Sequence, residues 1–86
     1  MKIKEGFVLR QMAGTTVVVP SGEALDMDVM ITLNDTGRFL WEHLEEETCI
    51  DALTAAVLKE YDIAEDAARN YIVKFTDRLK ELDLLA

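Results

Sequence analysis

The chain has 86 residues, 50% of them hydrophobic, which is enough for one domain with a single core over residues 1–86 and too apolar for a disordered chain. Nine Lys and Arg against seventeen Asp and Glu give a net charge of −8, which repels a phosphate backbone at long range and argues against a nucleic-acid partner. One cysteine excludes an internal disulfide, and no run is apolar enough for a signal peptide or a membrane span, so we expect a cytoplasmic protein without a membrane partner.

Two strand-like runs lie near the N-terminus. Residues 7–12 and 15–20 flank Ala13-Gly14, and β-branched residues dominate the second run. An X-Gly pair between two such runs is typical of a hairpin turn, so the pattern predicts an antiparallel β-hairpin. The hairpin is expected to end at Pro20.

A short third strand, predicted over 30–33, runs almost directly into a helix. Asn34 is a good helix N-cap and Asp35 favours the positive end of the helix dipole, so we predict a first helix over about 35–45. The path of residues 23–29, ahead of this strand, stays open between an irregular loop and a bulged approach.

Apolar residues at helical spacing define the three helices. The apolar face predicted for the first helix consists of Phe39, Leu40 and Leu44. Trp41 is expected off that face, over a second surface. Thr48 and Asp51 resemble a capping box at the start of a second helix over about 49–61. The third helix, over about 65–82, has an apolar stripe made of Ala68, Ile72, Phe75, Leu79 and Leu82.

Three strands therefore precede three helices, with residues 83–85 as a short tail that packs back. Strands first and helices afterwards is an α+β pattern. We predict a winged-helix-like fold in which a three-stranded antiparallel sheet is followed by three helices.

The sequence shows no catalytic constellation, and we expect a non-enzyme with no cofactor and no metal. His43, Glu47 and Cys49 lie close in sequence, but structural zinc normally takes four ligands, usually with paired cysteines. As a nucleophile, Cys49 would need a base to form its thiolate, and His43 would reach it only through an accident of the turn between them. We interpret His43 as a surface residue and Cys49 as a half-buried residue at a helix start.

Charge is segregated along the chain. Acidic residues crowd the segment 42–66, where Lys59 is the only basic residue, and this segment is either a solvated face or a surface for a basic partner. The third helix instead carries four basic residues, which are Arg69, Lys74, Arg78 and Lys80. Lys74 and Arg78 are four residues apart and share a face, which is either a solvated edge or a contact for an acidic ligand.

Several sequence elements follow one another in a specific order and spacing. They are "LN-x-T-G" at 33–37, "FLWEHL" in the first helix, "KEYD" at the end of the second, and the closing "F-x-x-x-L-x-x-x-x-LL". With these elements the chain resembles the PqqD-like family, from about Phe7 nearly to its end. It departs from the family pattern at Asp83, where we expect glycine, and at 26–29, where a more glycine-rich turn is usual.

The resemblance implies a function in the biosynthesis of ribosomally made and modified peptides (RiPPs). PqqD-like proteins are peptide chaperones, also called precursor-recognition elements, and they are not enzymes. They bind the leader segment of a ribosomally synthesised precursor peptide and present it to a modifying enzyme. For the founding member, this enzyme is a radical S-adenosylmethionine (radical SAM) protein of pyrroloquinoline quinone biosynthesis.

The resemblance also implies where the peptide binds, namely as an added strand along the third strand and against the third helix. Carried over by position, the predicted peptide-binding residues are Met30, Ile31, Thr32, Leu33, Tyr71, Lys74, Phe75 and Arg78. The free N–H and C=O groups of an edge strand can pair with another chain. Lys74 and Arg78 would meet an acidic leader, and Phe75 is expected in the core as well. The same edge permits a monomer or a homodimer.

Two other functions stay open. A winged-helix DNA-binding regulator would use the third helix as its recognition helix, although the acidic residues on that helix oppose phosphate contact. A protein-binding adaptor would use the acidic segment 42–66 instead. The sequence names neither the peptide nor the modifying enzyme.

Overall fold

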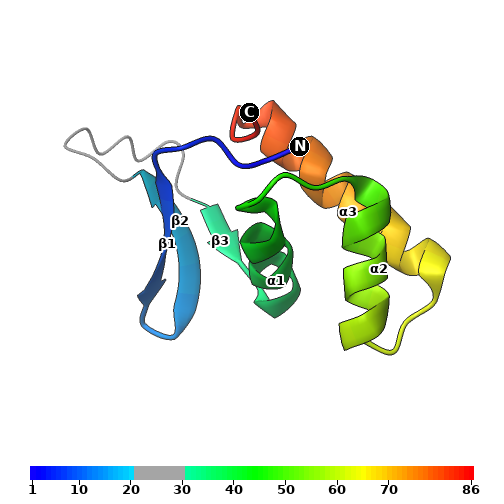
Figure 1. Ribbon diagram of the computed structural model, residues 1–86. Coiled ribbons are helices and arrows are strands. Elements are labelled where there is room, and N and C mark those ends of the chain that lie inside the picture. The colour runs from blue at the N-terminus through cyan, green and yellow to red at the C-terminus, as the bar shows by residue number, and fades with distance from the viewer. Residues whose placement is uncertain (21–30) are drawn as a thin grey trace.

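Three strands precede three helices in the computed structural model, which describes residues 1–20 and 31–86 (Figure 1). The elements are β1 Phe7–Met12, β2 Thr15–Pro20, β3 Ile31–Leu33, α1 Asp35–Leu44, α2 Ile50–Glu60 and α3 Glu65–Glu81. The predicted α+β order is confirmed, and each helix end lies within one residue of its predicted position. The first predicted residue of the third strand, Met30, and the segment 23–29 lie outside the described residues.

The sheet is antiparallel with the order β1-β2-β3, so β2 is central. Ala13 and Gly14 both have positive φ, 53° and 80°, as a two-residue type I′ hairpin turn requires. The predicted hairpin is therefore confirmed. β3 pairs with β2 in the register Thr16↔Leu33 and Val18↔Ile31. Within residues 1–20 and 31–86, β3 pairs on its β2 side only, which leaves its other edge without a strand partner.

The core lies between the sheet and the helices, and α1 contributes its largest side chain. Trp41 is 1% exposed, so the expectation that it covers a second surface was wrong. Gly37, Leu40, Trp41 and Leu44 are the buried residues of α1. Their i, i+3, i+4, i+7 spacing defines one face of a helix. Phe39 lies at the edge of that face and is half-buried.

The start of α2 differs from the predicted capping box. Its N-cap is Cys49, which makes no side-chain capping hydrogen bond. The backbone N–H of Thr48 donates to the carbonyl of Met1 at 3.0 Å, which ties this residue to the N-terminal segment. The Asp51 carboxylate accepts instead from Nη1 of Arg69 on α3, at 2.7 Å. Both predicted capping residues are thus engaged in tertiary contacts.

The C-terminal tail packs back on the core, as predicted. Leu84 is fully buried, and its N–H donates to the carbonyl of Leu79 at 2.9 Å. The N–H of Asp83 donates to the carbonyl of Lys80 at 3.0 Å, which completes a Schellman motif at the end of α3. Asp83 has φ 59°, the left-handed conformation that favours glycine. This explains the glycine expected at position 83.

The two ends of the chain meet beside the C-terminal end of α3 (Figure 1). Ile3 and Leu85 form an antiparallel bridge, and the N–H of Ala86 donates to the carbonyl of Lys2 at 2.8 Å. Ile3 and Leu84 are both buried, so the terminal segments cover one end of the core. Over residues 1–20 and 31–86, no helix is long and apolar enough to cross a membrane.

Candidate functional site

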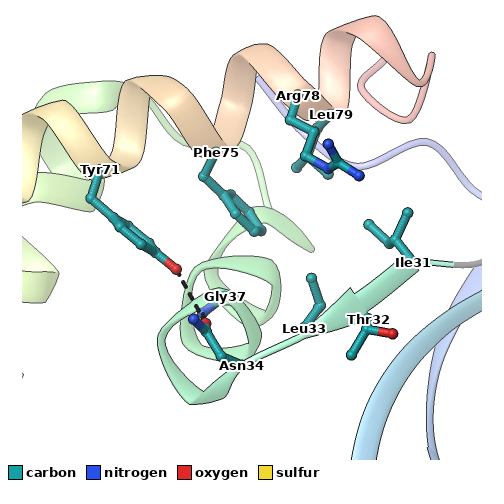
Figure 2. A pocket seen from close by; sticks show the side chains of 9 residues that line it. All are labelled: Ile31, Thr32, Leu33, Asn34, Gly37, Tyr71, Phe75, Arg78 and Leu79. Carbon is teal, nitrogen blue, oxygen red and sulfur yellow. Dashed lines mark hydrogen bonds between the residues drawn. The ribbon is translucent and has the colours of Figure 1, made fainter.

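A groove with a volume of about 140 Å³ lies between β3 and α3 (Figure 2). Residues of β3, of the start of α1 and of α3 line it, and they are Ile31, Thr32, Leu33, Asn34, Gly37, Tyr71, Phe75, Arg78 and Leu79. Figure 2 shows Tyr71, Phe75 and Arg78 projecting from α3 toward β3. The groove therefore combines an edge strand on one side with helix side chains on the other.

The β3 side of the groove has an apolar floor. Side chains alternate along a strand, and here Leu33 is buried, Ile31 is half-buried and Thr32 is exposed. Ile31 and Leu33 point toward α3, and Thr32 points away (Figure 2). The strand thus offers an apolar surface together with the backbone groups of the edge that faces away from β2.

The end of the groove at the C-terminus of β3 is fixed by the side chain of Asn34. Its Oδ1 accepts from the N–H of Gly37 at 2.8 Å, which is the helix cap predicted from the sequence. The same oxygen accepts from the hydroxyl of Tyr71 at 3.1 Å (Figure 2). One side chain therefore starts α1 directly after β3 and joins that junction to α3.

Gly37 allows α3 to approach α1 closely at this junction. A Cβ atom added to Gly37 would lie 3.3 Å from Cε2 of Phe75 and 3.2 Å from Oδ1 of Asn34. Both distances are tighter than an ordinary van der Waals contact. The glycine of the "LN-x-T-G" element thus makes room for the Phe75 ring, which packs against the core and also lines the groove.

Six of the eight predicted peptide-binding residues line the groove. Lys74 does not line it. On α3, Lys74 and the buried Leu79 lie on opposite sides of the row formed by Tyr71 and Arg78, and the side chain of Lys74 is exposed. Met30 lies outside the described residues. Arg78 is the basic residue that lines the groove, and it forms no salt bridge with a carboxylate of the described part of the chain.

Three lining residues were not predicted as part of the site. Asn34 and Gly37 belong to the "LN-x-T-G" element and were interpreted only as helix-start residues, although their shared motif was a usable signal. Leu79 was assigned to the core, where it is 1% exposed. In the sequence, Leu79 belongs to the apolar stripe of the third helix, and nothing in that pattern indicates that it also borders the groove.

The residues considered for metal binding or nucleophilic chemistry do not converge in the structure. Residues 1–20 and 31–86 contain no group of three His, Cys, Asp or Glu side chains that could hold a metal ion. His43 is exposed and stacks against Phe39 with ring centroids 4.6 Å apart, which confirms its interpretation as a surface residue. Cys49 is exposed, so its interpretation as a half-buried residue was wrong.

The groove lies within the region of the chain that one family model matches. The family model described as coenzyme PQQ synthesis protein D (PqqD) matches residues 15–85, which include all the groove-lining residues. Among solved structures, the chain is similar to TbiB1 in complex with the TbiA(beta) leader peptide. The TM-score is 0.78 at 21% identity, over 99% of this chain and 94% of that chain. No curated protein matches the sequence.

Proposed function

The chain belongs to the coenzyme PQQ synthesis protein D (PqqD) family, and we propose that it is a non-catalytic chaperone for the leader segment of a ribosomally made precursor peptide. The observation that carries this proposal is the groove between β3 and α3, where an edge strand faces a helix with apolar and basic side chains. The chaperone holds the leader while a separate modifying enzyme, such as a radical SAM protein, acts on the rest of the precursor.

The leader binds as an additional strand along the edge of β3 that faces away from β2. Main-chain hydrogen bonds give such a complex its affinity, and pockets for alternate side chains give it specificity. Every second leader side chain then faces the floor made by Ile31, Leu33 and Phe75. The fold shared with TbiB1, which was solved in complex with a leader peptide, supports leader binding by this chain.

The charge of the groove favours an acidic leader residue beside Arg78. The protein as a whole carries a net charge of −8 and repels an acidic peptide at long range. Arg78 lines the groove and has no carboxylate partner among the described residues, so a leader carboxylate can form a charge-assisted hydrogen bond with it. Lys74 is exposed outside the groove and contributes only a screened attraction.

Neither alternative function gains support from a specific contact. Arg69 on α3 lies 2.7 Å from Asp51 and 3.9 Å from Glu65, so this cation of the supposed recognition helix is already paired. A DNA-binding regulator therefore has fewer free charges on α3 than the sequence indicates. The acidic segment 42–66 stays a predicted surface for a protein partner, and the modifying enzyme is the partner that fits the proposed function.

An amide-shift titration tests the proposal. Isotope-labelled protein is titrated with the leader of the short peptide encoded beside its gene. We expect shifts at residues 31–33 and along 71–79, with protection of the β3 amides from exchange. Shifts confined to 42–66, or no shifts at all, would contradict leader binding in the groove and point to the adaptor function.

A further inference from the structure

A second cavity, of about 210 Å³, lies on the other side of Tyr71. Tyr71 lines both this cavity and the groove between β3 and α3, so the two hollows meet at this residue. The remaining walls come from the start of α1, the end of α2, the α2–α3 connection and the first turns of α3, and they include Val57, Ile63 and Ala67. The cavity therefore adjoins the proposed peptide groove at Tyr71.

The chemistry of this cavity is apolar. Among residues 1–20 and 31–86, the only ionisable groups that line it are the phenols of Tyr61 and Tyr71. Ile63 is 45% exposed and Tyr71 is 37% exposed, so part of the apolar surface of both side chains is in contact with water. An engineered apolar cavity of roughly 150 Å³ in another protein binds benzene. A volume of about 210 Å³ therefore admits a leucine or phenylalanine side chain.

One peptide in an extended conformation is long enough to occupy both the groove and the second cavity. The three residues of β3 span about 10 Å, and the seven-residue step from Tyr71 to Arg78 along α3 has nearly the same length. From Tyr71 to Ala67 is one more helical turn, about 6 Å, which two extended residues cover. A peptide that continues past the Asn34 end of the groove thus reaches the second cavity about two residues later.

We propose that this cavity is a second subsite, which takes one bulky apolar side chain of the same leader peptide. The inference rests on the proposed function, since it requires a peptide in the groove. The anchoring residue lies outside the segment that pairs with β3, at the end marked by Asn34 and Tyr71. A leader that this protein recognises therefore carries a leucine, phenylalanine or similar residue about two positions beyond the paired segment.

A filled cavity gives the sharpest test. Ala67 is an exposed helical residue whose side chain lines the cavity, so Ala67→Leu occupies the space without disturbing the core. Ala55→Leu is the matched control, because Ala55 is an exposed helical alanine that lines neither cavity. The probe is the fluorescently labelled leader of the peptide encoded beside the gene, together with its single-alanine variants. Binding is measured by fluorescence anisotropy.

We expect one apolar leader position outside the paired segment to lose about tenfold in affinity for the wild-type protein when changed to alanine. The Ala67→Leu protein binds the unmodified leader about tenfold more weakly and no longer distinguishes that alanine variant. The Ala55→Leu protein stays within twofold of wild type. Ile63→Ser, at a half-exposed position, provides a second variant and is expected to weaken the same contact.

The failure of this inference is distinguishable from failure of the proposed function. Ala67→Leu and Ile63→Ser proteins that bind the leader within twofold of wild type, while the amides of 31–33 still shift, would overturn the second subsite alone. A leader that neither binds nor shifts those amides would overturn the proposed function. Loss of affinity for the modifying enzyme in place of the leader would also overturn the subsite and assign the cavity to the enzyme.

Discussion

The hydroxyl of Tyr71 donates to Oδ1 of Asn34 at 3.1 Å, and this bond joins α3 to the junction of β3 and α1. The same oxygen caps α1 by accepting from the N–H of Gly37. The N–H of Gly37 and the hydroxyl of Tyr71, which lies 37 positions after Asn34 in the sequence, therefore share one acceptor at the end of the groove. The position of the helix that walls the groove is coupled in this way to the residue where the edge strand ends.

The first prediction concerns this shared acceptor. Asn34→Ala removes both the helix cap and the bond from Tyr71, and we expect the free energy of unfolding to fall by about 1–2 kcal/mol. Asn34→Asp keeps an acceptor at the cap and serves as the control, with a loss below about 0.5 kcal/mol. Tyr71→Phe removes only the hydroxyl bond at a partly exposed site, for a loss of about 0.5–1 kcal/mol. Urea denaturation measures all three, and equal losses for Asn34→Ala and Asn34→Asp would contradict the capping role.

The second prediction concerns the close approach at Gly37. Alanine is intrinsically the better helix residue by about 1 kcal/mol. Here its Cβ would meet Phe75 at 3.3 Å and Asn34 at 3.2 Å, so we expect Gly37→Ala to destabilise the protein by about 1 kcal/mol despite that preference. Phe75→Leu frees the space, so the double variant should be less destabilised than the sum of the two single variants. Strict additivity in the denaturation experiment would mean that the ring does not limit position 37.

The third prediction concerns the hairpin turn. Ala13 has φ 53°, a left-handed conformation that is unfavourable for alanine and easily adopted by asparagine. We expect Ala13→Asn to raise the free energy of unfolding by up to about 1 kcal/mol, measured by urea denaturation. The same change at the exposed helical Ala52 should lower stability by a few tenths of a kcal/mol instead. A stability loss at position 13 would show that the turn relaxes to another type in solution.

The fourth prediction concerns the end of α3. Asp83 occupies the left-handed position of the Schellman motif, so Asp83→Gly relieves backbone strain and is expected to stabilise the protein by about 0.5–1 kcal/mol. The change also removes the ion pair with Nζ of Lys4 at 2.6 Å, which contributes little because both groups are exposed. Lys4→Ala isolates that contribution. A destabilised Asp83→Gly protein alongside a destabilised Lys4→Ala protein would show that the ion pair outweighs the strain.

Sequence patterns predicted the elements closely and the contacts between them much less well. Helix ends were found because caps and apolar periodicity are local signals, as at Asn34. Trp41 was misassigned because the apolar face was drawn through Phe39, whereas the buried face includes the glycine at 37. The capping box predicted at Thr48 is absent from α2, where Thr48 bonds to Met1 and Asp51 bonds to Arg69 instead. Both partners are distant in the sequence, so the local pattern could not indicate these contacts.

The groove was located through the family resemblance, and its details depend on how α3 is placed against β3. Spacing alone put Lys74 and Arg78 on the same face of α3, yet only Arg78 lines the groove. The two side chains are only about 40° apart around the helix axis, and which of them borders the groove is decided by which residues of α3 enter the core. The bond between Tyr71 and Asn34 and the cavity beyond Tyr71 depend on that same placement.

The fifth prediction uses this difference between the two basic residues. Arg78→Glu places a negative charge in the groove, and we expect it to weaken binding of an acidic leader by tenfold or more. Lys74→Glu changes the same net charge at an exposed position outside the groove and should weaken binding by less than about threefold at physiological salt. Because both side chains lie at the surface of α3, the free energy of unfolding should change by less than about 0.5 kcal/mol in either variant. Equal effects of the two substitutions, vanishing together in high salt, would mean that the leader senses only the overall charge of α3 and makes no specific contact with Arg78.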